Sequence, residues 1–75
     1  MTNNTTSVVL ERTPTELYKI LKFEGLASSG GEAKQVIANG LVTVNGKVEL
    51  QKRKKIVAGD IIKFADNILE ISEKN

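Results

Sequence analysis

Six glycines divide this chain of 75 residues into short stretches, and each glycine falls at the edge of a run of periodic apolar residues. Because glycine adopts turn conformations at no steric cost, this spacing predicts short helices and strands. A chain of this length forms one small domain and buries only about 60% of the surface that its unfolded form exposes. The core must therefore be compact. The glycines are residues 25, 30, 31, 40, 46 and 59.

Two stretches carry helix start signals followed by apolar residues at helical spacing. Thr13 to Glu16 combines a capping threonine, a proline suited to the first helical position and a glutamate that completes a capping box. The helix that follows is predicted to end near Gly25. Ser29 to Glu32 is a second capping box, and Gly40 is predicted to end the second helix. Each helix is too short to persist alone in water, so both need a surface to pack on.

The second half of the chain, with one short segment near the N-terminus, supplies strands for that surface. Asn45-Gly46 is a hairpin turn signal. A two-residue loop would place Val44 opposite Lys47 and Val48 opposite Thr43. We favour a three-residue loop with a glycine bulge, because it brings the valines onto one face. The strands are predicted at 8–10, 41–44, 47–50, 55–57, 61–64 and 68–72.

These elements predict an α+β fold, a helix pair packed on a small, bent, mainly antiparallel sheet. Residues 1–7 are expected to be a frayed N-terminus, and 8–75 to form a single domain. Phe23 and Phe64 are assigned to the core. The other residues assigned to it are Leu17, Ile20, Leu21, Leu26, Val36, Ile37, Val42, Val44, Ile56 and Ile62.

Composition excludes several classes of function. The chain has no cysteine and no histidine, which removes disulfides, thiolate nucleophiles and the commonest general base and metal ligand. Its nine acids are too dispersed for a paired-carboxylate site. No apolar run approaches the roughly 18 residues that span a bilayer, and the polar N-terminus does not read as a signal peptide. We therefore expect an intracellular protein that is not an enzyme and has no cofactor, metal or membrane partner.

Charge is divided unevenly along the sequence. From Lys34 to Lys63 there are seven basic residues and two acids, whereas the remainder has four basic residues and seven acids. The local charges of +5 and −3 predict a cationic part for an anionic partner. The densest basic run, Lys52 to Lys55, is assigned to a loop and the start of the strand after it. Alone, such a run could also be a solvated loop.

Two features at the second helix suit phosphate binding. Gly30-Gly31 would allow close approach of a phosphate to the free amides at the helix start, although a flexible connection explains the glycines equally well. Lys34 lies beside the apolar stripe and is a solvated lysine unless the basic loop lies on the same side. The chain has only three aromatic residues, so base stacking is not expected to dominate.

Several short motifs, in this order, resemble the S-four RNA-binding domain, also called the alpha-L motif. The resemblance covers about 16–64, and the longer basic run resembles the small stand-alone bacterial members, the YbcJ-like and YaaA-like proteins. The matching residues are Leu26-Ala27-Ser28-Ser29, Glu32-Ala33-Lys34, Ile37, Gly40, Val42, Val44-Asn45-Gly46-Lys47-Val48 and Gly59-Asp60 with Ile62.

The resemblance implies binding of structured RNA, such as ribosomal or transfer RNA, through the helix pair and the loop after it. Lys34, Lys47 and Lys52 to Lys55 match basic positions of the family. Where the family often has Arg-Leu-Asp this chain has Glu16-Leu17-Tyr18, and Gly30 stands where the family often has arginine. Two usual phosphate contacts are therefore absent.

The sequence thus predicts a monomeric, cytoplasmic RNA-binding module that acts in ribosome assembly or translation. The alternative is a protein-interaction module that uses the same basic loop against an acidic partner. The residues predicted to bind RNA are Gly30, Gly31, Lys34, Lys47, Lys52, Arg53, Lys54 and Lys55.

Overall fold

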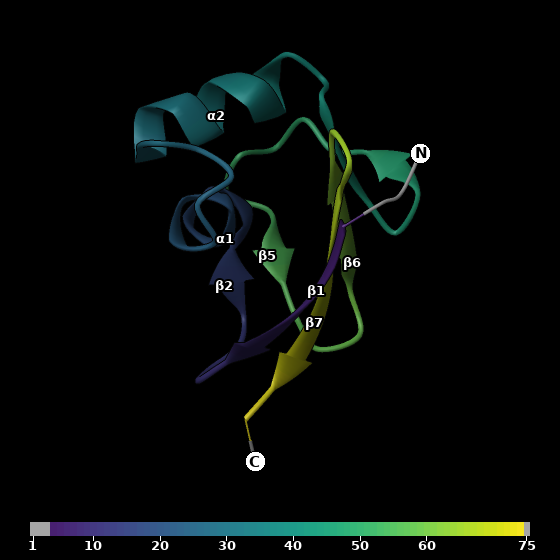
Figure 1. Ribbon diagram of the computed structural model, residues 1–75. Coiled ribbons are helices and arrows are strands. Elements are labelled where there is room, and N and C mark those ends of the chain that lie inside the picture. Colours follow the sequence, from purple (N-terminus) through teal and green to yellow (C-terminus); the bar gives the residue numbers. More distant parts are fainter. Residues whose placement is uncertain (1–3, 75) are drawn as a thin grey trace.

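The computed structural model describes residues 4–74, in which two short helices lie against a five-stranded sheet (Figure 1). A separate pair of two-residue strands joins the start of the first helix to the basic segment. The predicted α+β class is confirmed. The elements are β1 (Asn4–Leu10), β2 (Thr15–Glu16), α1 (Leu17–Phe23), α2 (Gly30–Ala38), β3 (Val42–Val44), β4 (Lys47–Val48), β5 (Lys55–Ile56), β6 (Ile61–Phe64) and β7 (Asn67–Glu73).

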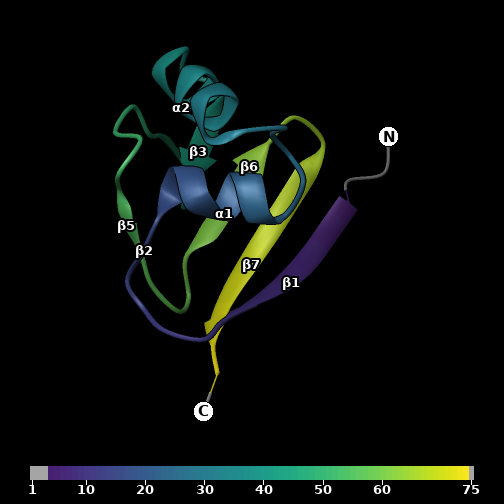
Figure 2. The same cartoon turned by 90° about the vertical axis from the view of Figure 1, so that its left-hand side faces the viewer.

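The large sheet has the order β1-β7-β6-β3-β4 and is mainly antiparallel. Its exception is the parallel pair of β1 and β7, which joins the two ends of the chain. α1 lies in front of the sheet with α2 above it, and β1 forms the outer edge (Figure 2). The expectation of a frayed N-terminus is wrong for Asn4 to Ser7, because β7 gives these residues a ladder partner. Residues 1–3 lie outside the described part.

The start of α2 agrees with its sequence signal. The Ser29 hydroxyl oxygen accepts a hydrogen bond from the Glu32 amide at 3.1 Å, as predicted. The Glu32 carboxylate reaches back to Ser28, whose hydroxyl donates to it at 2.6 Å. The helix ends before Gly40, which has a φ of +76°. Side chains from a single five-residue stretch, 28–32, therefore define the beginning of this helix.

The start of α1 differs from the prediction. Thr15 and Glu16 are strand residues that pair with β5, and the helix begins only at Leu17. Its N-cap residue, Glu16, makes no side-chain capping bond. The first two amides of α1 donate instead to carbonyls of the loop 51–54. The predicted capping box at 13–16 is wrong, because that prediction rested on partners close in sequence, whereas a distant segment supplies the acceptors. The helix ends near Gly25, as predicted.

The β3–β4 hairpin has a two-residue loop, not the three-residue loop that we favoured. Val44 lies opposite Lys47, and Asn45 and Gly46 have φ angles of 54° and 85°. This is the arrangement that suits the twist of a tight hairpin. The bulge was favoured because it would bury both valines, but Val48 lies on an edge strand with 59% of its surface exposed.

The hairpin turn is tied to the start of β6. The Asn45 side-chain amide donates to the Asp60 carboxylate at 3.0 Å, and its carbonyl oxygen accepts from the Ile61 amide at 2.8 Å. The other Asp60 oxygen accepts from the Val57 amide at 2.9 Å. Two of the motifs that carry the family resemblance therefore contact each other, and their role here is to hold the sheet together.

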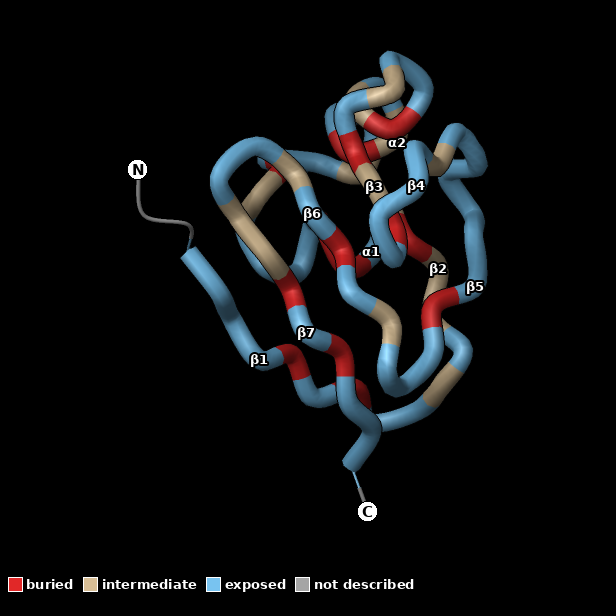
Figure 3. Tube along the Cα trace, turned by 90° about the vertical axis from the view of Figure 1, so that its right-hand side faces the viewer, coloured by how far each residue is buried: buried red, intermediate tan, exposed pale blue. Residues whose placement is uncertain are grey.

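The core lies between the helices and the sheet (Figure 3). Most of the predicted core residues are buried, and Phe64 packs partly buried against them. Phe23 was assigned to the core wrongly, since 68% of its surface is exposed. Neither helix of 4–74 has the length and apolar character needed to cross a membrane. The buried residues are Val8, Leu10, Leu17, Ile20, Leu21, Ala27, Ala33, Ile37, Val42, Val44, Ile56, Ile62, Leu69 and Ile71.

Candidate nucleic-acid interface

The basic loop, Gln51–Lys54, lies against the start of α1. The Leu17 amide donates to the Lys54 carbonyl at 2.9 Å, and the Tyr18 amide donates to the Lys52 carbonyl at 3.1 Å. These bonds satisfy helix amides that otherwise lack acceptors. They also fix the loop backbone in place. The loop side chains and that of Lys55 remain exposed.

Tyr18 connects this loop to α2. The Lys34 ammonium nitrogen lies 4.7 Å from the centroid of the Tyr18 ring, a cation–π distance. The ring also lies against Gly30, where an added Cβ would be 3.7 Å from the nearest ring carbon. One residue of α1 therefore contacts α2 through its side chain and the basic loop through its amide. Lys34, Gly30 and the backbone of the loop are therefore all adjacent to Tyr18.

The start of α2 offers free amides to this same region. Ser29 accepts bonds from the amides of Glu32 and Ala33, but no hydrogen bond within 4–74 uses the amides of Gly30 and Gly31. Helix amides in this position attract anions, aided by the positive end of the helix dipole. The negative charge of Glu32 is directed to Ser28.

Lys47 stands apart from this group. It is exposed on β4, the edge strand of the large sheet, where it lies opposite Val44. The ion pair between Lys19 and Glu16, at 3.4 Å, is the only one found in 4–74. None of the predicted RNA-binding cations is therefore neutralised by an acidic side chain of that part. We call the group formed by Gly30, Gly31, Lys34, Tyr18 and residues 52–55 the cationic surface.

Sequence reasoning identified every member of the cationic surface except Tyr18. The available signal was the departure from the family pattern, since Tyr18 and Gly30 both stand where the family often has a charged residue. The structure brings these two departures into contact. An aromatic ring packed on a glycine stands at two positions where the family often has charged side chains, and the Lys34 ammonium group lies over that ring.

A helix pair on a bent sheet with an unpaired cationic surface defines a small α+β binding module, and sequence comparison gives its family. The chain belongs to the S4 domain family, whose model matches residues 8–72. This is the family that the motifs above resemble.

Individual relatives agree with this assignment. The chain is 48% identical over 56 residues to the Escherichia coli (strain K12) protein named "Putative RNA-binding protein YbcJ", covering 75% of this chain and 80% of that protein. A Shigella flexneri protein, "Uncharacterized protein YbcJ", matches equally well. The solution structure of YbcJ from E. coli, whose description gives it an alpha-L motif involved in RNA binding, superposes with a TM-score of 0.65. That match has 40% identity and covers 96% of this chain and 90% of the other.

Proposed function

We propose that this protein binds structured RNA, of the ribosomal or transfer RNA class, through contacts to phosphates and without catalysing a reaction. The observation that carries the proposal is the position of Tyr18. It joins the basic loop to Lys34 and the open start of α2, and so gathers unpaired cations with free backbone amides. The RNA-binding names of the YbcJ relatives support the same conclusion.

The composition of the surface decides how it recognises RNA. Lysine and arginine contacts to phosphates fix the position of a protein on a nucleic acid but read no sequence directly. The groove of an A-form duplex that carries base information is too narrow for side chains, so duplex RNA is recognised by its shape and backbone. Base stacking is not favoured at the cationic surface, because Tyr18 is half-buried under Lys34 and Phe23 lies at the other end of α1. We therefore propose that the protein recognises folded RNA.

The wider role is part of the same proposal. Structured RNAs of this class belong to the ribosome and the translation machinery, so we propose action in ribosome assembly or translation, in the cytoplasm. The cationic surface comes from one copy of the chain, so a monomer suffices for binding. Lys47 would reach RNA only if the bound molecule extended over β4.

The test is the salt dependence of binding to bulk transfer RNA and to purified ribosomal RNA. Each neutralised phosphate contributes a slope of about −0.7 to −0.9 in log affinity against log salt. The loop variant has alanine at Lys52, Arg53, Lys54 and Lys55. Its slope should be shallower by the contribution of about two to four phosphate contacts, and its binding to both RNAs should be weaker.

The chain provides a matched control. Changing Arg12, Lys19, Lys22 and Lys74 to alanine removes the same net charge from outside the cationic surface. This control should retain a steeper salt slope than the loop variant. Equal slopes in the two variants would mean that only net charge matters. If the parent protein binds neither RNA, the proposed function is wrong, and an acidic protein partner for the loop becomes the alternative.

A further inference from the structure

The outer edge of β1 is an unpaired strand edge. Within residues 4–74, β1 has β7 as its only neighbour in the sheet. The Asn4 amide donates to the Asp66 carbonyl and the Lys74 amide donates to the Leu10 carbonyl, both at 2.8 Å. Because alternate residues of a parallel strand bond to the same neighbour, the even-numbered residues of β1 face β7. The amides and carbonyls on the outer edge belong to Thr5, Ser7 and Val9.

This edge lacks the features that normally prevent pairing. Natural edge strands are protected by charged side chains, proline, bulges or short length. β1 has seven residues, none of them charged and none of them proline. Val9 also presents an apolar side chain, 59% exposed, beside the free backbone groups. The strand is therefore able to accept another strand.

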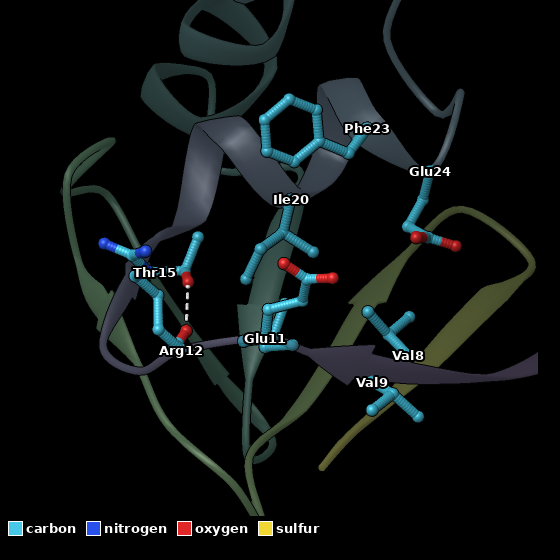
Figure 4. Close-up of a pocket in the computed structure, with 9 residues that line it drawn as sticks. Val8, Val9, Glu11, Arg12, Thr15, Ile20, Phe23 and Glu24 are labelled. Atoms are coloured by element: carbon cyan, nitrogen blue, oxygen red, sulfur yellow. Dashed lines mark hydrogen bonds between the residues drawn. The ribbon is translucent and has the colours of Figure 1, made fainter. Parts of the chain in front are cut away.

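An apolar groove runs along the same edge, between β1 and α1 (Figure 4). It has a volume of about 360 Å³. Ile20 of α1 points down into it, Val8 points up from the strand, and Phe23 lies above with its ring mostly exposed. A strand added to β1 would direct every second side chain into this groove.

Two carboxylates flank the groove. Glu11 follows β1, Glu24 follows α1, and both side chains extend toward the space between the two elements (Figure 4). No ion pair among the described residues includes either of them. Arg12 also lines the groove, but its guanidinium is turned away, toward β2 (Figure 4). A basic side chain lying in the groove would therefore meet two unpaired acids.

We propose that the outer edge of β1 binds an extended segment of another protein, in which apolar residues alternate and a lysine or arginine accompanies them. The segment pairs with Thr5, Ser7 and Val9, places its apolar side chains beneath Phe23, and places its basic side chain near Glu11 and Glu24. RNA is disfavoured here because its phosphates would face these two carboxylates. A second copy of β1 is disfavoured because that strand carries no basic residue.

This surface is separate from the cationic surface. The basic loop contacts the first residues of α1, whereas Phe23 and Glu24 lie at its other end, about 10 Å along the helix axis. RNA and a protein segment can therefore occupy the domain together, and a test made without RNA does not depend on the proposed function.

The test begins with a displayed library of random 12-residue peptides, selected on the RNA-free protein. The enriched peptides should share alternating apolar residues and a lysine or arginine. When such a peptide is added, hydrogen exchange followed by NMR should show slowed exchange at the amides of Thr5, Ser7 and Val9. Those amides should exchange rapidly in the free protein, because no strand within 4–74 pairs with the outer edge.

Two exposed positions give matched variants. Phe23→Ser should weaken the peptide about tenfold, since anchors of this kind carry much of the binding energy. Val48→Ser changes another exposed apolar residue, on the opposite edge strand, and should leave affinity within about twofold. Any of three results would overturn the proposal: no enriched sequence, enriched peptides that protect only the basic loop, or slowed exchange at β1 that depends on protein concentration without peptide.

Discussion

The two helices of this protein begin in opposite ways. α2 is capped by its own neighbours, Ser28 and Ser29, and its first two amides are open. α1 has no side-chain cap, and its first two amides are occupied by carbonyls of the basic loop. The first amides of a helix therefore serve two purposes in this protein. Those of α1 position the cations of the basic loop, and those of α2 are left available for an anion. A helix start becomes a binding feature only when the fold leaves it unoccupied.

The largest expected effect comes from truncating a core residue of β5, the strand that pairs with the residues just before α1. Ile56 on β5 is fully buried and lies opposite Thr15. Ile56→Ala should lower the free energy of unfolding by about 2–5 kcal/mol, because it leaves a cavity in the core. Chemical denaturation measures this change. Val57→Ala, one residue further on and half exposed, should cost less than about 1 kcal/mol.

The open start of α2 is tested through its lysine. Lys34→Glu should weaken RNA binding by about tenfold or more, since it replaces an attraction with a repulsion at a charged contact. Its stability should change by no more than about 1 kcal/mol, the size of the contact with the Tyr18 ring that it removes. Lys34→Ala should fall between the parent and Lys34→Glu, measured by fluorescence anisotropy at fixed salt.

Lys74→Glu makes the same change in net charge near the C-terminus, where the structure places no member of the cationic surface. It should reduce affinity far less than Lys34→Glu does. An equal loss in the two variants would mean that Lys34 has no specific place in binding.

Capping substitutions sharpen the contrast between the two helix starts. Ser29→Ala removes the acceptor for the Glu32 amide and should cost about 1 kcal/mol of stability. Thr13→Ala changes the residue that the sequence assigns as the first cap, but Thr13 lies outside α1 and should cost less than about 0.5 kcal/mol. Thermal or denaturant unfolding of both variants measures the difference. Equal costs would mean that Thr13 has a structural role equal to that of the Ser29 cap.

The smallest expected effect belongs to the residue that connects the two starts. Tyr18→Leu keeps the amide bond to the loop but removes the ring beneath Lys34. A cation–π contact of this kind contributes about 0.5–1 kcal/mol, so RNA affinity should fall about two- to fivefold. Tyr18→Phe keeps the ring and should bind RNA as the parent does. A loss in the phenylalanine variant equal to that in the leucine variant would assign the role to the hydroxyl.

The contrast between the helices also explains which parts of the fold could be predicted. The start of α2 depends on residues within one turn of each other, so its capping signal was sufficient. The start of α1 depends on a pairing between Thr15 and Ile56, and no local signal specifies that pairing. The same reasoning applies to the bond between Asn45 and Asp60, residues that are 15 positions apart.

The prediction of which apolar residues are buried was less reliable than the prediction of the start of α2. The preference for a bulged hairpin assumed that Val48 belongs in the core, and the assignment of Phe23 made the same assumption. Both residues are apolar and exposed, one on an edge strand and one above a groove. For the candidate site, the basic residues and glycines were identified from charge and composition. Tyr18 could not be found in this way, because its role arises from contacts between α1, α2 and the loop.

The central claim is that RNA binds the free amides at the start of α2, whereas the first amides of α1 stay bonded to the basic loop. The most direct measurement is the hydrogen exchange of backbone amides by NMR, with and without bulk transfer RNA. Leu17 and Tyr18 should be protected in the free protein and stay so, because the basic loop already accepts their hydrogen bonds. Gly30 and Gly31 should exchange rapidly in the free protein and become protected when RNA binds. Bound RNA that leaves Gly30 and Gly31 unprotected would contradict the account.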